Sequence, residues 1–231
     1  MSTRKPLAII LAAGMGSRLG RPHPKPLTPL NDGETILRRQ LRMLKGAGLE
    51  VLVVVGFKMD LIMEAAPDVS FVYNPDYDTT NTARSLSRAL QQVHDRDVLW
   101  MNGDVVFHPR VLDGVLATEG SIVAVNTERV GEEEVKYITN EAGYITEISK
   151  QVKNAEGEAL GINRIESGHL EQFKQCLAEV GAQDYFERGM EVLIQQEGDV
   201  FRPHSVGNDL CIEVDFEADL ERAVKALDAL T

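Results

Sequence analysis

The feature that most constrains the fold is an alternation of short apolar strands with amphipathic helices along residues 7–125. The clearest strand spans 51–55, a continuous Val-Leu-Val-Val-Val run closed by Gly56. Such runs are typical of parallel strands that are buried on both faces. The clearest helix spans 34–47, where apolar residues recur at helical spacing. This alternation predicts an α/β fold with a doubly wound, mostly parallel Rossmann-like sheet and helices on both faces.

The second half of the chain departs from this alternation. Two strand-like segments flank the turn 140–143 and predict a small β-hairpin inserted into a mixed sheet. A chain of 231 residues suits one domain, so we expect a single domain over 1–231 whose character changes near residue 130. The predicted strands are 7–11, 51–55, 71–73, 98–101, 122–125, 135–138, 144–148, 160–165, 200–204 and 212–214. The predicted helices are 34–47, 59–66, 81–93, 111–117, 168–180, 185–195 and 217–230.

The composition restricts the class of partner. The formal net charge of −12 argues against a broad contact with nucleic acid or with an anionic membrane. No apolar stretch is long enough to span a bilayer, and 7–13 is better explained as a buried strand than as a signal peptide. Cys176 and Cys211 lack metal-ligand spacing and favour free thiols over a disulfide. We therefore expect a cytoplasmic protein, and the sequence is compatible with a homo-oligomer.

Positive charge is concentrated on a glycine-rich loop after the first strand. The first 30 residues contain five Lys or Arg residues and no Asp or Glu. Glycine lets backbone N–H groups approach a ligand, and Arg18 and Lys25 offer a guanidinium and an ammonium to phosphate oxygens. The spacing of Gly14, Gly16 and Gly20 does not match the dinucleotide-binding fingerprint, and no P-loop is present. The loop therefore predicts a site for a phosphorylated small molecule.

A longer motif around this loop narrows the class. The chain resembles the nucleotidyltransferases that activate sugar phosphates and alcohol phosphates in the run Leu11-Ala12-Ala13-Gly14-x-Gly16-x-Arg18, followed by Pro24-Lys25-Pro26-Leu27. The resemblance implies that the backbone of 11–14 meets the base and ribose and that 16–18 wraps the phosphates. It also implies that Arg18 and Lys25 act in catalysis, with Lys25 at the α-phosphate. The loop positions that it assigns to nucleotide binding are Leu11, Ala12, Ala13, Gly14, Gly16 and Ser17.

Two aspartates resemble the metal-binding pair of the same family. Asp104 follows an apolar strand in the step Gly103-Asp104, and Asp215 stands just before the last predicted helix. Two carboxylates together with nucleotide phosphates suit Mg²⁺ as a cofactor. The resemblance also adds Gly103 to the nucleotide-binding positions. Two alternatives stay open for Asp215: it could cap the helix, and Glu213 could supply the metal ligand instead.

The segment 79–86 resembles the phosphocholine cytidylyltransferase branch, in which this stretch helps to read the nucleotide base. The resemblance implies base contacts from Asn81, Thr82 and Ser85. Helix capping by Thr80 or Asn81 explains the same residues equally well.

Candidates for binding the acceptor lie in the second half of the chain. Lys150 could reach the acceptor phosphate, and Glu134 and Tyr137 belong to the segment that begins with the acidic run 132–134. A surface lysine and a solvated acidic turn are the alternatives. Acids suit a primary amine or the hydroxyls of a polyol phosphate, whereas choline requires aromatic faces. The single tryptophan, Trp100, lies inside an apolar strand, where we expect it to be part of the core.

Together these features predict a Mg²⁺-dependent nucleotidyltransferase. It would transfer CMP from CTP to a small phosphorylated or phosphonate alcohol and release pyrophosphate, with about 1–130 binding the nucleotide and about 131–231 the acceptor. A sugar 1-phosphate or an inositol phosphate is the alternative acceptor. A nucleotide-binding regulatory protein without catalysis is the alternative of another class, and the cations and aspartates named above argue against it.

Overall fold

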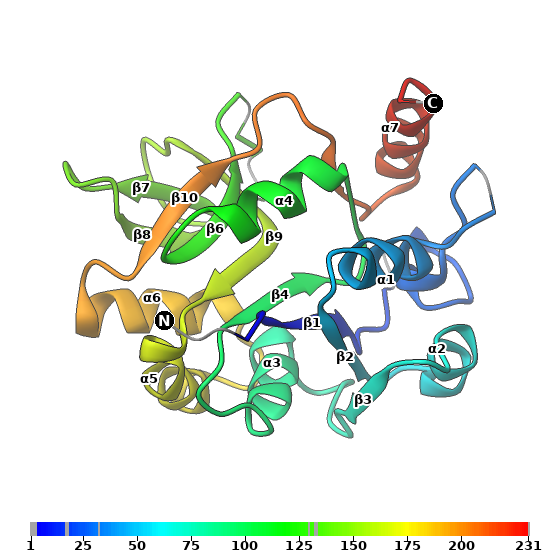
Figure 1. The fold of residues 1–231 in the computed structure, drawn as a ribbon, viewed down its shortest axis with the longest axis horizontal. Coiled ribbons are helices and arrows are strands. Elements are labelled where there is room, and N and C mark those ends of the chain that lie inside the picture. The colour runs from blue at the N-terminus through cyan, green and yellow to red at the C-terminus, as the bar shows by residue number, and fades with distance from the viewer. Residues whose placement is uncertain (1–3, 17–18, 32, 129, 132–133, 231) are drawn as a thin grey trace.

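The computed structural model describes residues 4–16, 19–31, 33–128, 130–131 and 134–230, and it is built around one large sheet (Figure 1). In this part of the chain the strand order is β10-β6-β9-β4-β1-β2-β3, and the hairpin β7–β8 extends from β9. The strands on this path are β1 (Leu7–Ala12), β2 (Glu50–Val55), β3 (Ser70–Tyr73), β4 (Val98–Asn102), β6 (Ser121–Asn126), β9 (Gly157–Ile165) and β10 (Phe201–Ser205).

Helices cover both faces of the sheet, as the alternation predicts. Ile9 of β1 shares a core layer with Leu86 and Phe173, whereas its neighbour Ile10 shares the opposite layer with Leu37. The cause is that successive side chains of a strand point to opposite faces. No helix in the described residues is long and apolar enough to cross a membrane. The helices are α1 (Ile36–Gly46), α2 (Met59–Ala65), α3 (Thr82–Leu90), α4 (Pro109–Ala117), α5 (Ser167–Glu179), α6 (Phe186–Glu197) and α7 (Glu217–Asp228).

The sheet is mostly parallel, with one antiparallel strand in its middle. Strand β1 runs parallel to β2 and β4, whereas β9 is antiparallel to β4 and β6. Leu11 pairs with both Val54 and Asn102, so the carboxyl ends of these three strands share one edge of the sheet. In open α/β sheets ligands bind beyond that edge. The predicted mixed, mostly parallel fold class is therefore confirmed.

A small antiparallel sheet pairs β5 (Val105–Phe107) with β11 (Cys211–Glu213). The sequence predicts the second of these strands, shifted by one residue, but it does not predict β5. Three apolar residues directly after the turn 102–104 are too few to stand out as a strand of their own. The pairing joins the loop that follows β4 to the segment that precedes α7.

The remaining predicted elements are present, with ends displaced by no more than three residues. The predicted hairpin is β7 (Lys136–Thr139) and β8 (Ile145–Ser149), and β7 also pairs with the start of β9. Trp100 is fully buried, with its ring centroid 5.4 Å from that of Phe173 and 5.8 Å from that of Phe186. Its predicted place in the core is confirmed.

Candidate active site

Three charged side chains from distant parts of the chain meet at the carboxyl ends of β1 and β4. The Nζ atom of Lys25 donates to Oδ2 of Asp104 at 3.2 Å and also to Oδ1 of Asp215. Lys25 is only 8% exposed, so solvent screens these ion pairs weakly. The structure thus brings together the lysine predicted at the α-phosphate and both aspartates predicted to bind metal. We call these three residues the Lys25 cluster.

The glycine loop fixes the position of Lys25. Lys25 begins the short 3₁₀-helix η2 (Lys25–Leu27), which Pro24 precedes. Gly16 has a φ of +60°, and a Cβ atom there would lie 2.6 Å from Cγ of Lys25. A side chain at position 16 would therefore strain the backbone and collide with the lysine stem. The loop needs glycine here because its backbone lies directly on Lys25.

Asp104 is positioned by the close approach of two loops. The N–H of Gly103 donates to the carbonyl of Leu11 at 2.9 Å, and a Cβ atom on Gly103 would lie 2.8 Å from the same oxygen. Gln40 of α1 donates its Nε2 to the backbone carbonyls at both ends of the turn 102–105, at 2.9 and 2.8 Å. Sequence reasoning missed Gln40, although a polar residue on the apolar face of a helix could have revealed it.

Asp215 is positioned by β11 and by the first turn of α7. The N–H of Val214 donates to the carbonyl of Asp104 at 3.0 Å, which joins the two metal candidates through the backbone. Asp219 accepts from the N–H groups of Asp215 and Phe216 at 3.1 and 2.8 Å, and Phe216 is the N-cap residue. The alternative that Asp215 caps α7 is therefore wrong. Asp219 binds these donors from within the helix, and the carboxylate of Asp215 joins the Lys25 cluster instead.

Glu213, the alternative metal ligand, lies beside the cluster. Asn102 donates its Nδ2 to Oε1 of Glu213 at 3.1 Å. Burial, followed by the charges of Asp104 and Asp215, raises the pKa of the Glu213 carboxyl well above its usual range. The contacts place Asp215 against the Lys25 ammonium and Glu213 against the Asn102 amide.

Among the described side chains of this site, carboxyl groups outnumber cations. Burial raises the pKa of Asp104, and Lys25 opposes that shift only in part. Burial lowers the pKa of Lys25, but the two aspartates outweigh it and raise the pKa overall, so Lys25 is a cation at neutral pH. Among the described residues no three His, Cys, Asp or Glu side chains are grouped to hold a metal. A divalent ion at the two aspartates would therefore need oxygens from the nucleotide and from water.

The end of β1 leaves space beside the loop. The carbonyls of Leu11 and Ala13 accept backbone hydrogen bonds, at 2.9 and 3.0 Å, from the loops that follow β4 and β2. Ala12 is buried, whereas a Cβ atom on Gly14 would meet no other described atom within 4 Å. The backbone after Ala13 is therefore open to a ligand. Two further predicted positions, Ser17 and Arg18, lie outside the described residues.

The residues predicted to read the base have partners within the chain. Asn81 is the N-cap residue of α3, and its side chain accepts from the N–H of Thr82 at 2.8 Å. Oγ1 of Thr82 accepts from the N–H of Phe186 at 3.1 Å, and the buried Ser85 hydroxyl accepts from Nδ2 of Asn74 at 3.1 Å. The capping alternative thus describes Asn81 in this structure, and base recognition by these residues stays a prediction.

The residues predicted to bind the acceptor lie in different environments. Tyr137 is 2% exposed within the apolar core, and this placement argues against contact between its ring and an acceptor. The Nζ atom of Lys150 lies 5.4 Å from the ring centroid of Tyr185. Burial raises the pKa of Glu134, and nearby carboxylates, Asp215 among them, add to that shift. Acceptor binding by Lys150 and Glu134 stays a prediction, and the burial of Tyr137 argues against its part in it.

Two carboxylates that shape the site were missed by sequence reasoning. Asp219 supports the backbone before α7, as described above. Glu187 lies in the first turn of α6, where its Oε2 atom is buried without a hydrogen-bond donor among the described residues. Burial raises the pKa of Glu187 to about 7. An acid in the first turn of a helix is common, so nothing in the sequence distinguishes either residue.

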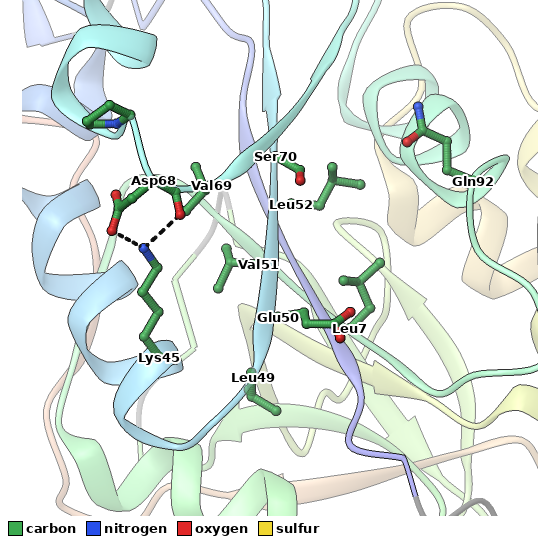
Figure 2. Close-up of a pocket in the computed structure, with 11 residues that line it drawn as sticks. Leu7, Lys45, Leu49, Glu50, Val51, Leu52, Asp68, Val69, Ser70 and Gln92 are labelled. Carbon is green, nitrogen blue, oxygen red and sulfur yellow. Dashed lines mark hydrogen bonds and ion pairs between the residues drawn. The ribbon is translucent and has the colours of Figure 1, made fainter.

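A hollow of about 620 Å³ lies at the opposite edge of the sheet (Figure 2). Its lining includes Leu7, Glu50 and Ser70, which are the first residues of β1, β2 and β3. Lys45 is directed at Asp68 in this hollow, and the two form an ion pair (Figure 2). This hollow is not the candidate site, because its charged side chains are paired within the chain and because it faces the amino ends of the strands.

Comparisons with known sequences agree with this geometry. Residues 8–196 match the family model of the MobA-like NTP transferase domain. A CMP-5'-(3-aminopropyl)phosphonate synthase of Streptomyces rubellomurinus is 44% identical over 130 residues, which cover 52% of this chain and 20% of that protein. A bifunctional IPC transferase and DIPP synthase of Rubrobacter xylanophilus is 32% identical over 181 residues, which cover 73% of this chain and 40% of that protein. The chain thus spans less than half the length of these curated relatives.

Two solved structures share the fold along nearly the whole chain. The inositol-1-phosphate CTP transferase from T. maritima has a TM-score of 0.79 at 18% identity and covers 99% of this chain and 98% of its own. The CTP:phosphocholine cytidylyltransferase from Streptococcus pneumoniae has a TM-score of 0.74 at 18% identity, with 97% and 100% covered. At this identity the likeness establishes the fold alone.

The fold, the glycine loop and the paired aspartates define the class as the nucleotidyltransferases. Within this class the chain belongs to the family of MobA-like NTP transferase domains, because the family model matches well over half of its length. The resemblance stated from the sequence is therefore confirmed.

Proposed function

We propose that the chain is a Mg²⁺-dependent cytidylyltransferase that transfers CMP from CTP to a small phosphonate or phosphate acceptor and releases pyrophosphate. The observation that carries this proposal is the convergence of Lys25, Asp104 and Asp215 beside the glycine loop. The names of the 44% identical relative and of the two solved structures support CTP as the donor. Within one domain, about 1–130 would bind the nucleotide and about 131–231 the acceptor.

The reaction needs positioning and charge neutralisation more than proton transfer. An ionised oxygen of the acceptor attacks the α-phosphorus of CTP and forms a new P–O bond. The bond between the α-phosphorus and the bridging oxygen breaks, and pyrophosphate leaves with the electron pair. Because the attacking oxygen is already negative near neutral pH, no general base is required. The rate then depends on in-line geometry and on cations at the α-phosphate and the departing pyrophosphate.

Asp104 and Asp215 are the residues that would hold Mg²⁺. The fit rests on their geometry, since both carboxylates already bind one cationic nitrogen between them. The ion, when bound, neutralises charge on the triphosphate. With the aspartates so engaged, Lys25 would exchange its carboxylate partners for an oxygen of the α-phosphate. The aspartates raise the pKa of Lys25, so the side chain is a cation before the exchange, and a phosphate oxygen would give it a new anionic partner.

The other predicted residues take supporting roles in this proposal. The backbone at the end of β1 and in the glycine loop would contact the nucleotide, and Arg18 would bind phosphate oxygens. Base recognition would come from the start of α3. The positions assigned to nucleotide binding are Leu11, Ala12, Ala13, Gly14, Gly16, Ser17, Asn81, Thr82, Ser85 and Gly103.

An inositol phosphate is a second candidate acceptor. It is favoured by the name of the T. maritima structure, whose fold covers nearly the whole of this chain. Against it stand the carboxylates of Glu134 and Glu187 at the acceptor end, which suit a cationic acceptor better than a polyol.

An acceptor panel tests the proposal. Pyrophosphate release would be measured with each of the four NTPs against 2-aminoethylphosphonate, 3-aminopropylphosphonate, phosphoethanolamine, phosphocholine, inositol 1-phosphate and glucose 1-phosphate. We expect turnover with CTP and a phosphonate or alcohol phosphate, and its loss when Mg²⁺ is chelated. Tight CTP binding without turnover on any acceptor would instead support a regulatory nucleotide-binding protein.

A further inference from the structure

Glu187 is a half-buried carboxylate that the reaction described above does not use. It lies in the first turn of α6, whose N-cap residue is Tyr185. Its Oε2 atom is shielded from solvent and accepts no hydrogen bond from any described residue. A carboxylate oxygen buried without a donor costs free energy, and buried polar atoms in proteins generally have partners. The carboxyl group accepts a hydrogen bond from the Glu187 backbone N–H, but its Oε2 atom is left for a donor from a ligand.

The start of α6 lies beside residues of the predicted site. The N–H of Phe186 donates to Oγ1 of Thr82 at 3.1 Å, and Thr82 is one of the residues predicted to read the base. Lys150 follows β8, and its Nζ atom lies 5.4 Å from the ring centroid of Tyr185, the N-cap residue of α6. Burial raises the pKa of Glu187, and the charge of Lys150 partly opposes that shift. Glu187 and Lys150 therefore lie near each other at the start of α6.

Lys150 places a cation near Glu187 without neutralising it. The ammonium of Lys150 lies over the ring of Tyr185, 5.4 Å from its centroid, and makes no ion pair with a carboxylate in the described part of the chain. The Lys150 ammonium and the Glu187 carboxylate are thus close but do not form an ion pair. Such an arrangement complements a ligand with one anionic and one cationic end.

We infer that Glu187 binds a primary ammonium at the far end of the acceptor while Lys150 binds its phosphonate or phosphate group. This inference rests on the proposed function and names its substrate class, the ω-aminoalkyl phosphonates and phosphates. A primary ammonium carries three N–H donors and can satisfy the buried Oε2 atom. Glu187 is thus a specificity residue, because it discriminates between acceptors that carry a cation and acceptors that do not.

The same geometry disfavours the other acceptors. A quaternary ammonium has no N–H donor and is bound by open aromatic faces. Here Lys150 already lies over one face of the Tyr185 ring, and Tyr137 is buried, so the described residues of this region offer a quaternary ammonium no cage of several aromatic faces. A polyol phosphate would satisfy Lys150 but would offer Glu187 only neutral hydroxyl donors, which form weaker hydrogen bonds with a carboxylate than an ammonium does.

The test compares two acceptors that differ in one group. Steady-state pyrophosphate release with CTP would be measured on 2-aminoethylphosphonate and on 2-hydroxyethylphosphonate, for the wild type and for Glu187→Gln. We expect Glu187→Gln to lose about tenfold or more in kcat/KM on the amine, mainly through KM, and little on the alcohol. The matched control is Glu191→Gln, one turn further along α6, whose half-buried carboxylate pairs with Arg188. This variant should leave kcat/KM unchanged on both acceptors.

Binding measurements separate this inference from the proposed function. Calorimetry would measure the affinity of 2-aminoethylphosphonate for the wild type and Glu187→Gln, and thermal unfolding would show that both are folded. Weaker binding to Glu187→Gln without turnover by the wild type would support Glu187 and contradict the proposed function. An equal loss on both acceptors, unchanged binding of the amine, or a wild type that uses only uncharged polyol phosphates would overturn the assignment of Glu187.

Discussion

The proposed nucleotide end and the proposed acceptor end of the candidate site differ in how their charges are satisfied. At the nucleotide end Lys25, Asp104 and Asp215 bind one another, and close glycine contacts fix the loops that carry them. At the acceptor end Glu187 and Lys150 lie near each other without an ion pair, and one carboxylate oxygen is unpaired. The first arrangement is preorganised for a reaction common to all acceptors. The second is completed by the ligand, so it should determine which acceptor is used.

The largest effect should follow from breaking the nucleotide end at Asp104. We expect Asp104→Asn to lower kcat by about 10³-fold on every acceptor, because one of two metal-binding carboxylates is lost. Pyrophosphate release measures the rate, and circular dichroism checks the fold. Asp113→Asn, at an exposed position of α4, is the control and should behave as the wild type. A rate close to that of the wild type would remove Asp104 from the site.

The next effect should come from Lys25. Lys25→Ala should lower kcat by about 10²-fold, and equally for 2-aminoethylphosphonate and 2-hydroxyethylphosphonate, because the ammonium acts on the α-phosphate of the nucleotide. Single-turnover measurements with saturating CTP test this. Lys45→Ala removes a lysine that pairs with Asp68 at the opposite edge of the sheet and should leave the rate unchanged (Figure 2). If the loss of kcat in Lys25→Ala differs between the two acceptors, the proposed nucleotide and acceptor ends do not act independently.

The acceptor end should show a dependence on pH that the nucleotide end lacks. Burial raises the pKa of Glu187 to about 7, so the carboxyl is mostly neutral below that pH and mostly ionised above it. Only the ionised form pairs with an ammonium, and Lys150 and Glu213 are the charged groups that face it. The KM for 2-aminoethylphosphonate should therefore fall by up to about tenfold between about pH 6 and pH 8.

The phosphonate group itself titrates near this range, so the pH profile needs its own controls. The profile for 2-hydroxyethylphosphonate contains the phosphonate titration alone and should be shallower. Glu187→Gln should give the shallow profile with both acceptors. If the wild type shows identical profiles for the amine and the alcohol, Glu187 does not bind the ammonium.

The smallest effect is expected at the surface contact between the glycine loop and α7. Arg21 pairs with Glu217 at 2.8 Å, and the Glu217 side chain is 59% exposed. Exposed ion pairs contribute between about 0 and 1 kcal/mol. Glu217→Gln should therefore change the free energy of unfolding in urea by less than about 1 kcal/mol. Its kcat should stay within about twofold of the wild type. A large loss of activity would extend the nucleotide end to α7.

Much of the nucleotide end could be predicted from the sequence. The glycine spacing, Lys25, and the two aspartates were named correctly as residues that meet, because each follows a strand or precedes a helix whose apolar pattern is strong. The proposed acceptor end depends more on tertiary structure. Tyr137 appeared available in the sequence but is buried, and Glu187 appeared to be an ordinary acid of a first helical turn.

The sequence by itself determined the alternation of strands and helices, the glycine loop and the charges that it carries, because these follow from local spacing and residue type. Tertiary structure alone decided which oxygen is left without a donor and which aspartate binds the backbone N–H groups just before α7. Both outcomes depend on where β5, β11 and α6 lie relative to the central sheet. Burial and hydrogen-bond partners are set by contacts between residues far apart in the chain, and a local pattern does not encode them.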